Sequence, residues 1–228
     1  VQNLIGLYAV NNPNPDSYTK TKAYLEYWEK FDKNPFYLQR AKELLDQHNH
    51  PRLLLKYYYL VESYQDAVQL KIDTETLTAW ELFMLSQSHS KLGQERKALF
   101  YSRLAIDKKA DQPSILKEHA KQLLSNSKLQ EAEQFAKQLL VQLPEDGEVM
   151  SHLAKTLILR NRLMEAEPYL SEALRLEPMN VEVLETMVNW LYRQNKLKEA
   201  KEYLNKIKQL SPTYYTELEK GLSNFGYP

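Results

Sequence analysis

The sequence has no cysteine, few glycines and no long apolar run, and each absence excludes a class of protein. With no Cys among 228 residues, disulfides, zinc–thiolate sites and thiol nucleophiles are excluded. The five glycines, at 6, 93, 147, 221 and 226, are too scattered for a phosphate-binding loop such as GxGxxG. No apolar run approaches the roughly 18 residues that span a bilayer, so we expect no membrane insertion.

The chain also has no excess of one charge. Its 30 Lys and Arg residues balance 30 Asp and Glu residues, so we expect no nucleic-acid partner. A mean hydropathy of −0.60 and 43% hydrophobic residues are typical of a folded, soluble protein. A cysteine-free chain suits the cytoplasm or the bacterial periplasm equally, so the compartment stays open. Because the chain begins at Val1 and shows no leader pattern, we expect a processed form or a piece of a longer protein.

What the sequence does have is an internal repeat. Three prolines that each follow a Leu-rich segment, Pro144, Pro178 and Pro212, are spaced by 34. Agreement of four such registers over three repeats is rarely chance, so we expect a repeat protein. The other registers are Ala98, Ala132, Ala166 and Ala200; Leu129, Leu163 and Leu197; and Glu131, Glu165 and Glu199.

Each repeat has the pattern of a helix, a tight turn and a second helix. One apolar stripe of a helix consists of Leu116, Ala120, Leu123 and Leu124. A Ser- and Asn-rich break follows, and a second stripe begins at Leu129. A two-helix unit cannot bury its stripe alone, so we expect neighbouring repeats to stack. The turn position carries residues that suit turns, of which Gly and Asn can adopt positive φ: Gly93, Ser127, Asn161 and Asn195.

This pattern resembles the tetratricopeptide repeat (TPR) family, whose units are about 34 residues long. The match rests on small residues at position 8 of the unit (Ser86, Ala120 and Ala154), on the Ala register at position 20 and on Pro at position 32. Leu or another mostly apolar residue replaces the family's aromatic residues near positions 4 and 11. The resemblance implies an all-α, right-handed α-solenoid of TPR helix–turn–helix repeats. Four repeats are expected, at 79–112, 113–146, 147–180 and 181–212.

The pattern loosens on both sides of the four repeats. We expect residues 1–78 to form irregular N-terminal helices with a degenerate TPR-like repeat at about 48–78. There the step from Ala67 to Ala98 is three positions short of the period. Residues 213–228 are expected to form a C-terminal capping helix and tail. Capping signals predict two N-terminal helices, one from Asp16 or Ser17 to Phe31 and one from Asn34-Pro35 to about Gln47.

The resemblance also implies a binding surface on the first helix of each repeat. In this family, positions 2, 5, 9, 12 and 13 line a concave groove that holds an extended or helical peptide. Trp80 and Phe83 would form an aromatic end, although packing against the degenerate repeat explains them equally well. The partner-binding residues so implied are Trp80, Phe83, Gln87, Lys117, Lys121, Leu124, Ser151, Lys155, Ile158, Glu185, Asn189, Tyr192 and Arg193.

One TPR subfamily binds the C-terminal tails of chaperones through a set of side chains called a carboxylate clamp, and this chain lacks most of the clamp residues. Lys117 matches the first clamp position. Where the clamp requires Asn, Asn, Lys and Arg, this chain has, in that order, Lys121, His152, Glu182 and Thr186. We therefore expect no Hsp70/Hsp90 carboxylate-clamp binding.

The five histidines have simpler interpretations than catalysis or metal binding. His48 and His50 lack a third ligand at a coordinating spacing, so a solvated loop is the better interpretation. His89 occupies a core-like position, and His119 and His152 lie on first helices, where packing or exposure is the ordinary role. No Ser or Asp is placed to form a triad with any of them. We expect no catalytic residue, no metal site and no cofactor.

Two glutamate pairs lie on the predicted second helices, at Glu131 and Glu133 and at Glu165 and Glu167. We interpret them as solvated charges on outer helix surfaces. Glu133 can pair with Lys137 at a spacing of i, i+4.

These observations favour a non-enzymatic protein–protein interaction scaffold or adaptor that binds a peptide or a partner helix in its concave groove. A second copy of the chain, bound through the N-terminal helices, is a further expected partner. The alternative is a TPR segment of a larger bacterial envelope assembly, for polysaccharide export or pilus biogenesis, that acts as a docking spacer. An enzyme with its site in the stretch 1–78 ranks last, because that stretch shows no catalytic constellation.

Overall fold

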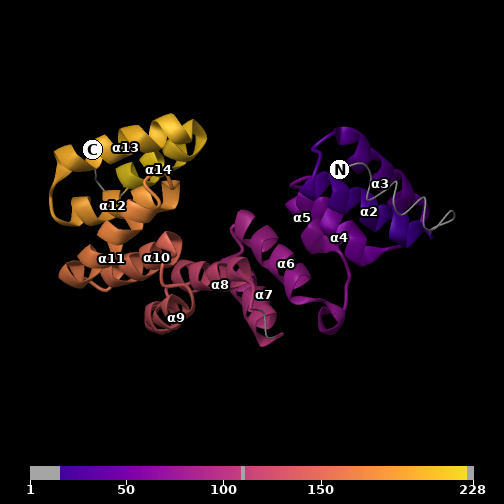
Figure 1. Cartoon of the computed structure of the whole chain (residues 1–228), viewed down its shortest axis with the longest axis horizontal. Coiled ribbons are helices and arrows are strands. Elements are labelled where there is room, and N and C mark those ends of the chain that lie inside the picture. Colours follow the sequence, from indigo (N-terminus) through magenta and orange to yellow (C-terminus); the bar gives the residue numbers. More distant parts are fainter. Residues whose placement is uncertain (1–15, 109–110, 225–228) are drawn as a thin grey trace. The chain divides into compact units, whose positions relative to one another are not determined.

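A computed structural model describes residues 16–108 and 111–224, and every regular element in these ranges is a helix (Figure 1). The described ranges hold thirteen α-helices and one short 3₁₀-helix, which confirms the all-α prediction. Parts of the predicted N-terminal region and of the predicted C-terminal tail fall on residues 1–15 and 225–228, which lie outside the described residues.

The chain divides into two compact units, Val1–His119 and Ala120–Pro228, with the boundary inside α8. The helices of the first unit are α2 (Ser17–Lys30), α3 (Pro35–Gln47), α4 (Pro51–Leu60), α5 (Tyr64–Gln69), η1 (Thr74–Thr76), α6 (Ala79–Lys91), α7 (Glu95–Asp107) and the start of α8 (Pro113–Ser125). The second unit holds the end of α8 and α9 (Leu129–Gln142), α10 (Gly147–Leu159), α11 (Leu163–Leu176), α12 (Val181–Arg193), α13 (Leu197–Leu210) and α14 (Pro212–Asn224).

The 34-residue period of the sequence corresponds to a pair of helices that recurs along the chain. The first helices α6, α8, α10 and α12 begin at residues 79, 113, 147 and 181, and the second helices α7, α9, α11 and α13 begin at 95, 129, 163 and 197. The two helices of a hairpin pack against each other, as α6 does with α7, α10 with α11 and α12 with α13. The hairpins also pack on their neighbours, since α10 contacts both α9 and α12.

The turn between first and second helix has the same backbone geometry in every repeat. The residues Gly93, Asn161 and Asn195 have positive φ, between 61° and 68°, as expected of Gly and Asn, and Ser127 also has positive φ, 56°. The next residue then donates its N–H to the carbonyl five residues earlier, at 2.9–3.0 Å, which satisfies an orphan carbonyl at the helix end. Glu62, between α4 and α5, has φ 57° and the same bond follows it, so the degenerate repeat uses the same turn.

Side-chain caps fix where several helices begin. Asp16 accepts from the backbone N–H of residue 19 and caps α2, and Asn34 accepts from the N–H of residue 36 and caps α3, which confirms both predicted starts. Thr78 and Glu81 form a reciprocal capping box at the start of α6. Asn180 caps α12 by accepting from two backbone N–H groups.

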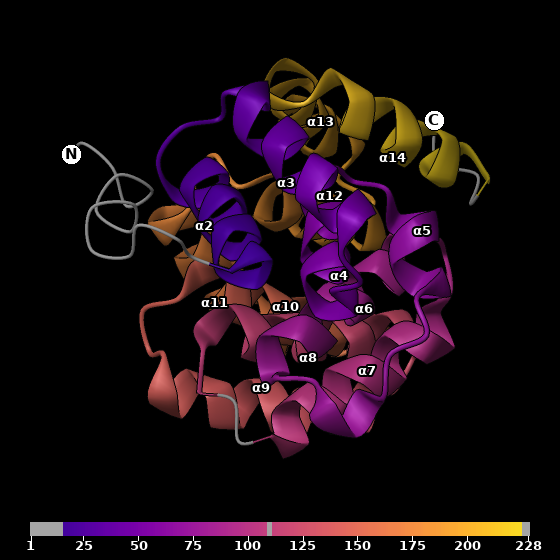
Figure 2. The same cartoon turned by 90° about the vertical axis from the view of Figure 1, so that its right-hand side faces the viewer.

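Apolar burial is organised differently in the two units. The first unit has two clusters, one where α2, α3 and α4 lie side by side (Figures 1 and 2) and one that joins α4 and α5 to α6 and α7. The second unit has a single cluster that runs from Ala136 on α9 to Leu222 on α14. The alanines of the repeat register, from Ala98 to Ala200, are at most 2% exposed, as close helix approach requires.

None of the described helices combines the length and the apolar character that crossing a membrane would need.

Candidate functional site in the second unit

Five of the nine predicted binding residues of the second unit lie around one hollow. Residues one repeat apart occupy equivalent places on successive first helices, so α8, α10 and α12 each contribute side chains to it. We call this side of the first helices the inner face. The hollow has a volume of about 330 Å³ and is lined by Lys121, Leu124, Ser125, Ser151, His152, Lys155, Leu159, Glu182, Glu185, Thr186 and Tyr214.

Two ion pairs cross the inner face of the second unit. Lys121 Nζ lies 2.5 Å from Glu182 Oε1, and Lys155 Nζ lies 3.0 Å from Glu185 Oε1. The Tyr214 hydroxyl, from α14, donates to the other carboxylate oxygen of Glu185. All of these side chains are partly open to solvent, so each pair contributes little to stability by itself but holds its charges in place.

Glu182 has the most perturbed carboxylate of the hollow. His152 Nε2 lies 3.8 Å from Glu182 Oε2, on the side of the carboxylate away from Lys121. The imidazole of His152 and then the ammonium of Lys121 hold the pKa of Glu182 well below its ordinary value, against the opposite effect of burial. Burial, followed by the negative charge of Glu185, raises the pKa of the Tyr214 hydroxyl.

A second hollow of about 350 Å³ adjoins the first, with Lys155 and Leu159 in the lining of both. Its other lining residues are Ile158, Asn189, Tyr192, Arg193 and Leu222, so the predicted Asn189 and Arg193 belong to this part of the inner face. Leu159 is 44% exposed, which gives the face an apolar side chain that a partner can reach.

Three of the predicted residues lie deeper than the others. Ser151, Ile158 and Tyr192 are 2%, 2% and 5% exposed. Ser151 donates to the hydroxyl of Thr186 at 2.9 Å, which links α10 to α12 beneath the ion pairs. These side chains form the floor of the face and have little area left for a partner.

In the first unit, the predicted aromatic end packs against the degenerate repeat. Phe83 is 5% exposed, and Trp80 stacks on it with ring centroids 4.6 Å apart. Both belong to the apolar cluster that includes Tyr59 of α4. Gln87 accepts a hydrogen bond from the Tyr59 hydroxyl, and Lys117 is half-buried. The structure thus shows the packing that the sequence left as an alternative.

Glu133 corrects one interpretation of the sequence. It is only 6% exposed, not solvated as its position on a second helix suggested. It accepts from Lys137 at 2.6 Å, as the i, i+4 spacing predicts, and also from Arg160 and Arg162 at the next turn. These cations, Lys137 first, lower the pKa of Glu133 to about 2.

Sequence reasoning also missed Tyr214 in the lining of the hollow and the grouping of Glu148 with His152 and Glu182. Tyr214 lies beyond the last repeat, where the periodicity gives no signal. His152 and Glu182 were each considered separately and Glu148 was not singled out, although the i, i+4 spacing of Glu148 and His152 and the separation of Glu148 from Glu182 by one repeat were readable. His89 and His119 pack in the interior, one of the roles expected for them, and are bonded to Gln94 and to Ser102, each at 2.9 Å. His50, expected in a solvated loop, is half-buried and is bonded to Ser17 at 3.0 Å.

No protein-family model matches the chain, and no curated protein matches it in sequence. Solved structures do match in fold. A thermophilic TPR protein of Thermus thermophilus, TTC0263, is 17% identical with a TM-score of 0.58, over 73% of this chain and 96% of that one. MamA from MSR-1 is 17% identical with a TM-score of 0.54, over 71% and 95% of the two chains.

A third match is a chain of the APC/C hetero-tetramer Cut9–Hcn1. It is 15% identical with a TM-score of 0.67, over 94% of this chain and 44% of that one. The matched proteins are TPR proteins, and their repeats follow the same helix–turn–helix plan as α6 to α13. The chain therefore has the fold of the tetratricopeptide-repeat proteins.

Proposed function

We propose that this protein is a non-enzymatic interaction scaffold that binds a peptide or a partner helix on the inner face of its second unit. The observation that carries the proposal is the hollow itself, where three first helices present partly exposed charges and an apolar side chain together. The TPR fold adds support by analogy, since related arrays bind protein segments on first helices.

The inner face is suited to binding because it is already ordered. Lys121 and Lys155 are held by Glu182 and Glu185, so few side chains lose further freedom when a partner docks. Leu159 offers an apolar contact beside them. A partner segment with one apolar side chain and charges of both signs fits this surface. An affinity near micromolar, about 8 kcal/mol, needs only a few such contacts.

The test is photo-cross-linking from single positions in extracts of the source organism. A photoreactive amino acid replaces Leu159 on the inner face or, as a matched control, Met164 on α11, which is 81% exposed. We expect a polypeptide that cross-links from 159 and not from 164.

The partner so identified is then purified and titrated. Leu159→Asp is expected to weaken its binding by about tenfold or more, and Met164→Asp to leave it unchanged. Both variants must keep the helical circular dichroism of the parent chain. Equal binding by both variants would remove the inner face from the proposal.

The envelope-spacer alternative is favoured by a different observation. Val141, Met164 and Met179 are 83%, 81% and 64% exposed in the second unit, outside both hollows. A docking spacer would use such outer apolar side chains, and it would cross-link from 164 and not from 159. The same experiment therefore separates the two functions.

Self-association through the N-terminal helices stays a proposal, supported by three aromatic side chains in and between α2 and α3. Tyr18, Phe31 and Phe36 are 42%, 51% and 48% exposed. Light scattering over a range of concentrations tests it, and a Phe31→Ser/Phe36→Ser variant should shift the mass toward the monomer. A mass that is monomeric throughout would contradict it.

A further inference from the structure

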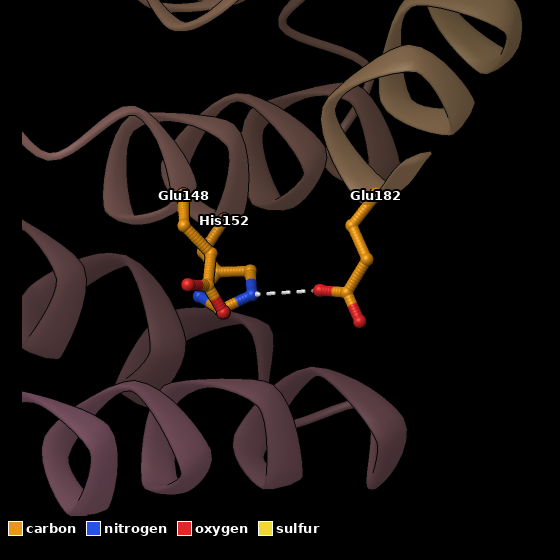
Figure 3. Close-up of side chains that lie close together, drawn as sticks. All are labelled: Glu148, His152 and Glu182. Carbon is orange, nitrogen blue, oxygen red and sulfur yellow. Dashed lines mark ion pairs between the residues drawn. The ribbon is translucent and has the colours of Figure 1, made fainter. Parts of the chain in front are cut away.

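Three potential metal ligands converge in the second unit (Figure 3). Glu148 and His152 come from α10 and Glu182 from α12, and one donor atom of each lies within 4.8 Å of the other two. In Figure 3 the dashed line joins the imidazole of His152 to Glu182, and the carboxylate of Glu148 overlaps the imidazole ring in this view. His152 and Glu182 also line the hollow described above.

Helix geometry and the repeat together bring these residues to one place. Glu148 and His152 are four residues apart, so their side chains share one face of α10. Glu182 lies one full repeat after Glu148 and therefore occupies the same place in the next unit, at the first turn of α12. Because α10 packs against α12, equal places on the two helices are neighbours.

His152 supplies an observation that is independent of the two acids. The residue is 5% exposed, and its Nδ1 is buried without a hydrogen-bond partner among the described residues, while Nε2 faces Glu182 Oε2 at 3.8 Å. A buried imidazole normally has a partner for each ring nitrogen, because an unsatisfied polar atom costs free energy. Nε2 is the ring nitrogen open to a further ligand, because its 3.8 Å separation from Glu182 Oε2 exceeds hydrogen-bond distance.

We propose that Glu148, His152 and Glu182 bind a first-row divalent cation, with Zn²⁺ as the cation that the donor set suits best. One imidazole nitrogen with two carboxylate oxygens is a ligand set for zinc and its neighbours, whereas Mg²⁺ and Ca²⁺ prefer oxygen ligands alone. Three protein ligands leave a fourth position for water.

The observed distances leave room for the ion. Zinc–ligand distances of about 2.0–2.2 Å place tetrahedral donor atoms about 3.4 Å apart. The pair of His152 Nε2 and Glu182 Oε2, at 3.8 Å, is already close to that value. Small rotations of the two partly exposed glutamates bring all three donors into range, while the buried imidazole keeps its place.

Lys121 is the group that opposes the cation. Its ammonium lies on Glu182 Oε1, and the oxygen that faces His152 is Oε2, so the metal and the ammonium use different oxygens. The two positive charges nevertheless repel each other across one carboxylate. Removing the lysine charge should therefore tighten metal binding, an effect that a purely structural role of these residues would not produce.

Titration calorimetry with ZnCl₂ on the whole chain at neutral pH tests the site. We expect one Zn²⁺ per chain, binding weakened about tenfold or more by His152→Ala, and binding tightened roughly threefold by Lys121→Gln. The matched controls are His48→Ala and Glu167→Gln, which remove an exposed imidazole and an exposed carboxylate elsewhere and should change nothing.

The proposal is overturned if zinc does not bind, or if it binds His152→Ala as tightly as the parent chain. It is also overturned if the control substitution His48→Ala abolishes binding. If His152→Ala loses its helical circular dichroism, Glu148→Gln, which keeps the side-chain shape, gives the decision. Zinc-edge X-ray absorption is an independent measurement. We expect one imidazole nitrogen among oxygen donors, and a spectrum without imidazole would contradict the site.

Discussion

The inner faces of the two units occupy equivalent repeat positions, yet their side chains do different things. In the first unit Phe83 is buried, Trp80 stacks on it and Gln87 accepts from Tyr59 of the degenerate repeat. In the second unit Lys155 and Glu185 pair with each other beside a hollow and stay partly exposed. A position in a repeat therefore does not determine its role, because the element packed against it decides whether the side chain supports the fold or faces a partner.

The substitution with the greatest expected effect removes a buried aromatic side chain of the first unit and tests whether it supports the fold. Phe83→Ala should lower the free energy of unfolding by about 3–5 kcal/mol, since it empties space in a packed cluster. Leu159→Ala, on the exposed inner face of the second unit, should cost less than about 1 kcal/mol. Urea unfolding followed by circular dichroism measures both. Equal losses would remove the difference between the two faces.

Acid should weaken the second unit through Glu133, whose carboxylate joins α9 to the turn between α10 and α11. Its pKa is lowered from 4.5 to about 2, so the ion pairs stabilise the fold above pH 4.5 and lose their effect as the pH falls toward 2. At pH 7 the contribution is at most about 3 kcal/mol. Urea unfolding of Glu133→Gln and the parent should differ at pH 7 and converge as the pH approaches 2.

The control for this pH effect is Glu172→Gln. Glu172 pairs with Arg175 at 2.6 Å on the surface, where both side chains are more than 40% exposed, so its removal should change stability little at any pH. A pH-independent difference between Glu133→Gln and the parent would show that Glu133 acts through packing and not through its charge.

The turn of the degenerate repeat should behave like the turn of a regular repeat, because both have the same backbone conformation. Gly93 has φ +68° with no atom within 4 Å of an added Cβ, so Gly93→Ala should cost about 1 kcal/mol through the backbone alone. Glu62 adopts the same conformation without the freedom of glycine, so Glu62→Gly should stabilise the chain by up to about 1 kcal/mol. Thermal unfolding of both variants checks this, and destabilisation by Glu62→Gly would mean that its turn is not equivalent.

The smallest effect concerns the hydrogen bond that closes the hollow. Tyr214→Phe removes the hydroxyl that donates to Glu185 and should lower the free energy of unfolding by about 1 kcal/mol. Tyr215→Phe, whose hydroxyl donates to Glu219 at an exposed site, is the matched control and should cost almost nothing. Indistinguishable urea midpoints would mean that Tyr214 only covers the hollow.

Much of the fold was predictable because it depends on local patterns that repeat. The period of the sequence predicted the helix starts, and Gly93 and Asn161 predicted turns with positive φ. The caps at Asp16 and Asn34 were equally local. Such features depend on a few neighbouring residues, so one sequence is enough to recognise them.

The candidate site was less predictable because it depends on contacts between helices. Nothing near Glu133 in the sequence indicates that Arg160 and Arg162 of the next repeat bury its charge. Tyr214 reaches the hollow only because α14 packs on α13. The burial of Phe83 depends on α4, whose repeat is too degenerate for its packing to be inferred by analogy with the other repeats.

Because the chain has no cysteine, any introduced thiol is unique, so thiol labelling can show whether a partner covers the inner face of the second unit. Leu159→Cys on the inner face of the second unit is compared with Phe100→Cys on α7 of the first unit and Met164→Cys on α11, all at exposed positions. Their labelling rates with a thiol reagent are measured with and without the partner recovered by cross-linking. We expect the partner to slow labelling at 159 alone. Protection at 100 or 164 with an unchanged rate at 159 would contradict it.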